Sequence, residues 1–192
     1  MNYIFDFDGV LVDSMPVWAG TYVNILTQNG IAVPDGFVRK ITPLGNLGAA
    51  RCVADEGVSL SAEEIVKKAM EVYDYEYRNN VKLKPYVAET LLKLTKAGNT
   101  VNVLTGSSHG YVDICLKRHG IYDLFTNVWS VDDFHFTKAD VRIYQEAAKR
   151  LFTNVTECIF FDDNINNIIV AKELGINAVL FTDVQEALRL IG

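Results

Sequence analysis

Five short runs rich in β-branched and aromatic residues recur along this chain, and stretches with helical periodicity separate the later ones. The runs are Tyr3–Phe7, Thr100–Thr105, Asn127–Val131, Glu157–Asp162 and Asn177–Thr182. Strands that alternate with helices are typical of a parallel sheet, because each parallel connection needs a crossover segment. The sequence therefore predicts an α/β fold built on a doubly wound, parallel, Rossmann-like sheet.

The segment between the first two runs is far longer than the ~12 residues that one crossover needs, which indicates an insertion. This insertion has the periodicity of helices. The candidates are Val17–Asn29, Leu47–Glu56 and Ala62–Arg78. Ser61 and Glu64 precede and begin the last of them in the capping-box arrangement. We therefore predict an α/β core formed by 1–14 and 80–192, with 15–79 as a small, all-helical cap.

The composition excludes several classes of function. The chain carries 18 Lys and Arg against 24 Asp and Glu, a net charge of -6, and lacks the basic surface that nucleic acids require. Its three cysteines have no metal-type spacing, and it shows neither a signal peptide nor an apolar run of membrane-spanning length. We expect a cytoplasmic monomer or weak dimer that binds neither nucleic acid nor membranes.

Carboxylates follow two of the predicted strands at the point where each strand ends. Asp6 and Asp8 close the first run, and Asp162 and Asp163 close the fourth. The carboxyl ends of parallel strands meet at one edge of a sheet, where ligands bind. Crowded carboxylates raise one another's pKa or recruit a cation, and oxygen ligands favour Mg²⁺ over Zn²⁺. The sequence therefore predicts a magnesium site at this edge.

Asp6 and Asp8 can also divide the work of a phosphoryl transfer. They stand at i and i+2, so their side chains point to the same side of an extended strand. One carboxylate can act as nucleophile while the other gives a proton to the leaving oxygen. A single Asp at a strand end more often begins a turn, but four together favour a catalytic site.

The run from Asp6 to Ser14, DFDGVLVDS, resembles the first motif of the haloacid dehalogenase superfamily, in the branch of the phosphoglycolate phosphatases and β-phosphoglucomutases. Thr105 resembles the second motif, Lys138 the lysine of the third, and the pair Asp162 and Asp163 the fourth. The insertion after Ser14 stands where this branch carries its cap. The resemblance implies that Asp6 forms an aspartyl-phosphate.

The resemblance also implies the other roles in the core. Asp8 is the general acid and base, and Lys138 offsets the negative charge. Mg²⁺ bridges Asp6 and the phosphate, with the Asp8 backbone carbonyl and Asp163 as further ligands. Asp162 is either a ligand or a residue that supports one, so the two alternatives stay open.

Thr105 and the backbone N–H groups of Gly106 and Ser107 are expected to donate hydrogen bonds to the phosphate oxygens.

Two departures from the family pattern stand out. Thr137 and Ala139 flank Lys138, where the third motif commonly has Gly and Pro. The other departure lies after the fourth motif. Asn166 and Asn167 stand there in place of small residues. Either the shape of this loop differs, or the two amide side chains contact the substrate or a metal-bound water.

Substrate specificity is expected to come from the cap. Arg39 and Arg51 are candidates for binding a second anionic group, and Trp18 for forming a wall of the pocket. The alternatives are that the basic residues are solvated and that Trp18 belongs to the core of the cap. His109 is interpreted as a surface histidine.

These observations predict a Mg²⁺-dependent phosphatase that hydrolyses a small phosphorylated metabolite. One alternative is a β-phosphoglucomutase-like mutase, in which a sugar hydroxyl rather than water accepts the phosphoryl group. A second is a non-catalytic binding protein with the same fold. Release of free phosphate, or conversion of β-glucose 1-phosphate to glucose 6-phosphate, separates the two enzymes.

Overall fold

The computed structural model describes residues 1–182, and the chain divides into two compact units. One unit combines Met1–Asp13 with the described residues from Lys82 onward, and the other is Ser14–Val81. The first contains all the strands and is called the core unit below. The second contains only helices and is called the cap unit.

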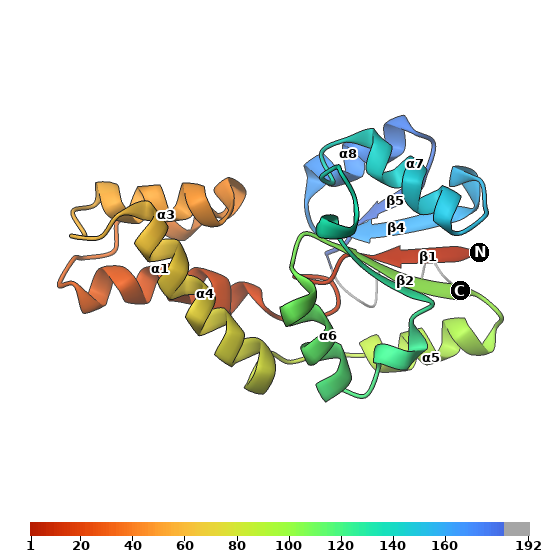
Figure 1. Ribbon diagram of the computed structural model, residues 1–192, viewed down its shortest axis with the longest axis horizontal. Coiled ribbons are helices and arrows are strands. Elements are labelled where there is room, and N and C mark those ends of the chain that lie inside the picture. The colour runs from red at the N-terminus through yellow and green to blue at the C-terminus, as the bar shows by residue number, and fades with distance from the viewer. Residues whose placement is uncertain (183–192) are drawn as a thin grey trace. The chain divides into compact units, whose positions relative to one another are not determined.

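The core unit contains a five-stranded sheet in the order β3-β2-β1-β4-β5, with every neighbouring pair parallel (Figure 1). The strands are β1 (Asn2–Phe5), β2 (Thr100–Thr105), β3 (Asn127–Ser130), β4 (Cys158–Asp162) and β5 (Asn177–Leu180). The chain starts in the middle of the sheet and winds outward to each side in turn. The predicted doubly wound α/β fold is confirmed.

Helices cover both faces of this sheet (Figure 1). They are α5 (Val87–Lys96) and α6 (His109–Arg118) on one face, and α7 (Val141–Arg150) and α8 (Ile165–Glu173) on the other. Side chains alternate along a strand, so Ile4, Leu104 and Phe160 all face the second pair. There they join Tyr144 and Ile168 in one buried cluster. Burial on both faces explains why the strands are almost continuously apolar.

The cap unit is built from α1 (Met15–Gln28), α2 (Phe37–Ile41), α3 (Gly45–Asp55) and α4 (Ala62–Asn79), with a 3₁₀ turn at Thr42–Leu44. The predicted capping box is present at the start of α4. Ser61 Oγ accepts from the Glu64 N–H at 3.2 Å, and Glu64 Oε2 accepts from the Ser61 N–H at 2.8 Å. Tyr22 and Ile65 are fully buried inside this unit.

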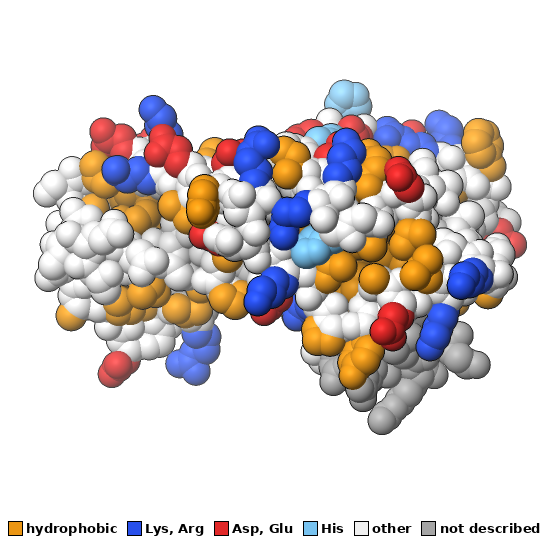
Figure 2. Space-filling model, turned by 90° about the horizontal axis from the view of Figure 1, so that it is seen from below, with side chains coloured by type: hydrophobic (Ala, Val, Ile, Leu, Met, Phe, Trp, Pro, Cys, Tyr) orange, Lys and Arg blue, Asp and Glu red, His pale blue; other side chains and the backbone are white. Residues whose placement is uncertain are grey.

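Two properties of the surface bear on partners. On the face seen in Figure 2, basic and acidic side chains are intermixed with polar and apolar ones. Within residues 1–182, no helix combines the length and the apolar character needed to cross a bilayer.

The register of the central strands brings the polar strand ends together. Phe5 pairs with Phe161 of β4 and with Val103 of β2. Asp6 follows directly, and its N–H donates to the Phe161 carbonyl at 2.8 Å. The next residue of β4 is Asp162. The two aspartates therefore lie side by side at the carboxyl edge of the sheet.

Candidate active site

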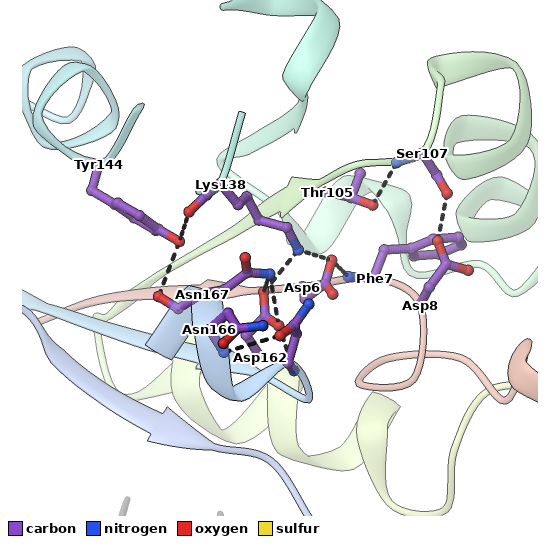
Figure 3. Close-up of polar contacts among 11 residues, drawn as sticks. Asp6, Phe7, Asp8, Thr105, Ser107, Lys138, Tyr144, Asp162, Asn166 and Asn167 are labelled. Carbon is purple, nitrogen blue, oxygen red and sulfur yellow. Dashed lines mark hydrogen bonds and ion pairs between the residues drawn. The ribbon is translucent and has the colours of Figure 1, made fainter. Parts of the chain in front are cut away.

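A buried lysine lies between the aspartate that follows β1 and the aspartate that ends β4 (Figure 3). Lys138 Nζ is 2.8 Å from Asp6 Oδ1 and 2.8 Å from Asp162 Oδ2. The Lys138 side chain is 10% exposed, and Asp162 is fully buried. Buried charges are retained in proteins when they are paired and hydrogen-bonded. This triad places the positive charge directly against the expected nucleophile.

The electrostatics of this triad follow from burial and charge. Burial raises the pKa of Asp6 to about 8, and the Lys138 charge opposes that rise. Burial disfavours the charged form of Lys138, but the charges of Asp6 and Asp162 outweigh it and raise the pKa of this lysine. Burial, together with the neighbouring Asp162 charge, also raises the pKa of Asp163. A divalent cation would stabilise the ionised carboxylates.

Asp162 is fixed by donors on both of its oxygens. Its Oδ2 accepts from Lys138 Nζ at 2.8 Å, and its Oδ1 accepts from the Asn164 N–H at 2.8 Å. Asn167 Nδ2 donates to Oδ1 at 3.1 Å and to Oδ2 at 3.0 Å. Four contacts occupy the acceptor capacity of a carboxylate. We therefore infer that Asp162 supports its neighbours, while Asp163 is the residue of the pair that is available to a metal.

The carboxylates fit a hard cation. One oxygen each from Asp6, Asp162 and Asp163 lies within 4.8 Å of the others, and Asp163 is exposed. The donors are all oxygens, as Mg²⁺ prefers. Gly9 permits the close approach, because a Cβ at this position would lie 2.1 Å from Asp163 Oδ2 and the backbone has φ +75°. Asp6 and Asp163 would hold the ion.

Asp8 points away from this carboxylate group. Its Oδ2 accepts a hydrogen bond from Ser107 Oγ at 2.5 Å, so its side chain faces the loop after β2 (Figure 3). Phe7, between the two aspartates, is fully buried, and its carbonyl accepts from the N–H groups of Leu11 and Val12. This turn separates the two carboxylates into different environments, as a nucleophile and a proton donor require.

The loop after β2 carries the expected phosphate donors. Thr105 is 1% exposed, and its Oγ1 accepts from the Ser107 N–H at 3.0 Å. The Ser107 N–H is therefore engaged within the loop in this structure, and Ser107 Oγ is engaged with Asp8. Gly106 has open space where a side chain would be. Phosphate binding by this loop stays a prediction.

The three cap residues that the sequence suggested for substrate binding all lie in the cap unit. Arg39 and Arg51 are exposed. Trp18 is partly buried, and its Nε1 donates to Asn46 Oδ1 at 2.8 Å. The Tyr22 hydroxyl is 3.1 Å from the same oxygen. Trp18 therefore has a structural partner in the cap, and the roles of all three in substrate binding stay predictions.

Sequence reasoning did not predict the contacts of three residues that the structure places near the motifs. Asn167 contacts Asp162, and the hydroxyl of the buried Tyr144 is 2.9 Å from the Lys138 carbonyl oxygen. His109, at the start of α6, contacts Asp133 through Nε2 at 2.8 Å and Asp113 through Nδ1 at 3.2 Å. The only sequence signal for Asn167 was its departure from the small residues usual there.

A model of the haloacid dehalogenase-like hydrolases matches residues 3–181. The fold and the carboxylate-lysine site agree with that class, and the chain belongs to the haloacid dehalogenase-like hydrolase family. The expected family and the expected enzyme class, a phosphatase within it, are both confirmed.

Curated relatives support this assignment, and a solved structure shares the fold. The phosphoglycolate phosphatase of Vibrio vulnificus (strain CMCP6) is 28% identical over 179 residues, which cover 89% of this chain and 78% of the relative. Hexitol phosphatase B of Escherichia coli (strain K12) is 22% identical over 183 residues, covering 92% and 81%. The crystal structure of a HAD-superfamily hydrolase from Geobacter sulfurreducens PCA shares the fold, with a TM-score of 0.76 at 18% identity over 100% of this chain and 96% of that one.

Proposed function

We propose that this protein hydrolyses a small-molecule phosphomonoester with the help of Mg²⁺, through a phosphorylated Asp6. The observation that carries the proposal is the buried contact of Asp6 with Lys138, next to the exposed carboxylate of Asp163. Relatives named for phosphoglycolate and hexitol phosphates support a small phosphorylated metabolite as the substrate class.

The reaction has two steps. A carboxylate oxygen of Asp6 attacks phosphorus, the ester P–O bond breaks, and Asp8 gives a proton to the departing alcohol oxygen. A water molecule then attacks the phosphorus of the aspartyl-phosphate and gives a proton to Asp8. The Asp6–phosphorus bond breaks, and inorganic phosphate leaves. Asp8 ends each turnover in the protonation state in which it began.

The surrounding residues lower the barrier by positioning charge. Lys138 lies beside Asp6 and offsets the negative charge that approaches it. Asp6 and Asp163, with the Asp8 backbone carbonyl, would hold a Mg²⁺ ion, which would supply further positive charge for the phosphate oxygens. The cap unit is proposed to contribute substrate specificity, with Arg39, Arg51 and Trp18 as the residues to test.

A panel of phosphate esters, assayed for released phosphate with and without Mg²⁺, tests this function. We expect turnover of at least one small ester by the wild type, and its loss with a chelator. Asp6→Asn and Asp8→Asn should remain folded and lose turnover. A mutase would instead convert β-glucose 1-phosphate to glucose 6-phosphate in the presence of a bisphosphate. A folded protein that is inert on the whole panel would contradict the proposal.

A further inference from the structure

Asn167 makes contacts in the interior of the core unit, and the helix that carries it begins directly after the fourth motif. It is 9% exposed, and it lies in the first turn of α8. Its amide nitrogen donates to both oxygens of Asp162, at 3.1 and 3.0 Å (Figure 3). An amide that bridges both oxygens of a carboxylate fixes the plane of that carboxylate as well as its position.

The orientation of Asp162 determines where the lysine head group lies. Asp162 Oδ2 accepts from Lys138 Nζ at 2.8 Å, and the same nitrogen is 2.8 Å from Asp6 Oδ1. A lysine ammonium has three N–H donors, so these two contacts leave a third for a phosphate oxygen. If the plane of Asp162 turned, the lysine would lose one of the two contacts that aim it.

Tyr144 holds the backbone of the same lysine. Its ring is 1% exposed and packs edge-on against Phe160, with ring centroids 5.2 Å apart. Its hydroxyl is 2.9 Å from the Lys138 carbonyl oxygen and 3.3 Å from that of Asn167. The shorter of the two contacts is the one to the Lys138 carbonyl. Lys138 is therefore held at its main chain by one residue and at its head group through another.

We propose that Asn167 and the Tyr144 hydroxyl are positioning residues for Lys138. Asn167 acts through Asp162 on the ammonium group, and Tyr144 acts on the carbonyl. The inference rests on the proposed function, in which Lys138 neutralises charge at Asp6. Asn167 and Tyr144 matter more for the position of Lys138 in this chain because the lysine is flanked by Thr137 and Ala139, where the family commonly has Gly and Pro.

A purely structural role makes a different prediction. If Asn167 only satisfied the buried carboxylate of Asp162, its loss would lower stability and leave the catalytic rate of the folded enzyme unchanged. If it positions the lysine, its effect on rate must pass through Lys138. Two residues that act on the same group give non-additive effects when they are replaced together.

The test is a double-mutant cycle on the full chain with Mg²⁺ and the best ester from the panel. We expect Asn167→Leu to lower kcat about 10- to 100-fold, as loss of a supporting partner in an active site typically does. KM should change less than about threefold, because the transition state loses more than the ground state. In a Lys138→Gln background, Asn167→Leu should change kcat less than about twofold.

Two further variants complete the design. Asn177→Leu places the same substitution at an exposed position in β5 and should leave kcat unchanged. Tyr144→Phe removes only the hydroxyl, and it carries the test if Asn167→Leu does not fold. We expect it to lower kcat severalfold, again with no further loss in the Lys138→Gln background.

The outcomes separate the inference from the function on which it rests. A wild type that releases no phosphate from any ester overturns the proposed function, and the inference with it. If the wild type is active, and folded Asn167→Leu and Tyr144→Phe have the same kcat, the inference is overturned but the proposed function is not. Equal losses of kcat in the wild-type and Lys138→Gln backgrounds would also overturn it, because the residues would then act independently of the lysine.

Discussion

Replacing Lys138 with Met should destabilise the metal-free protein, because it leaves two buried carboxylates without their shared cation. Lys138 Nζ is 2.8 Å from an oxygen of Asp6 and from an oxygen of Asp162. At that distance, a pair of full charges represents about 6 kcal/mol of attraction at an effective dielectric constant of about 20, before the cost of desolvation. Loss of one partner of a buried pair leaves a net cost of about 3–5 kcal/mol. Asp6 can bind a proton, since its pKa is raised to about 8. We therefore expect the loss of stability to lie near the lower end of this range of about 3–5 kcal/mol.

The assay is urea unfolding at pH 7 in the presence of a chelator, then with Mg²⁺. Lys149→Met is the matched control, because Lys149 is 80% exposed and lies 3.7 Å from Glu146. We expect the control to stay within about 0.5 kcal/mol of the wild type. Mg²⁺ should stabilise Lys138→Met more than the wild type, because the ion then meets less positive charge. Unfolding of Lys138→Met within about 0.5 kcal/mol of the wild type in chelator would refute the reasoning.

Three further predictions test the carboxylates and their surroundings. Without metal, the raised pKa of Asp6, about 8, means that the folded state keeps a proton that the unfolded state releases, so wild-type stability falls from pH 4 to pH 8. Urea titrations should show a smaller fall in the free energy of unfolding between pH 4 and pH 8 for Asp6→Asn than for the wild type. An equal fall in both proteins would contradict this prediction. Gly9→Ala should lower the free energy of unfolding by at least about 1 kcal/mol, because Gly9 has a positive φ and an added Cβ would collide with Asp163. It should also weaken Mg²⁺ binding, measured by calorimetry. An unchanged Mg²⁺ affinity would show that the close approach of Gly9 to Asp163 does not matter for metal binding. Burial lowers the pKa of His109, but hydrogen bonds and charge from two carboxylates outweigh burial and raise this pKa. The contribution of His109 to stability is therefore full below pH ~6.5, and it is lost as pH rises through the pKa of the folded state. The difference in unfolding free energy between wild type and His109→Gln should therefore be larger at pH 6 than at pH 8.5.

The architecture of the core could be predicted from the sequence because it depends on local patterns. Each strand is a short apolar run, and glycines such as Gly98 and Gly120 end the helices between them with positive φ. The start of α4 was predictable at Ser61, because a capping box involves only residues three apart. The five-residue helix α2 was not predicted, since Phe37–Ile41 is too short to show a helical period.

The site was predictable in its residue types but only partly in its contacts. Parallel strands place Asp6 and Asp162 at one edge by topology alone, so their proximity followed from the predicted sheet. The side-chain directions did not follow, because they depend on tertiary partners. Asp8 faces Ser107, and Asn167 faces inward to Asp162. Lys138 lies in a loop without a periodic pattern, and its assignment came from the family resemblance.

The most direct test of the central claim is to look for phosphate bound covalently to Asp6. Wild-type protein is mixed with Mg²⁺ and a turned-over ester, quenched in acid within milliseconds, digested, and mapped by mass spectrometry. The account predicts a phosphorylated residue in the N-terminal peptide that contains Asp6, and none in Asp6→Asn. Rapid release of phosphate with no label on Asp6, or with the label on another residue, would contradict the account.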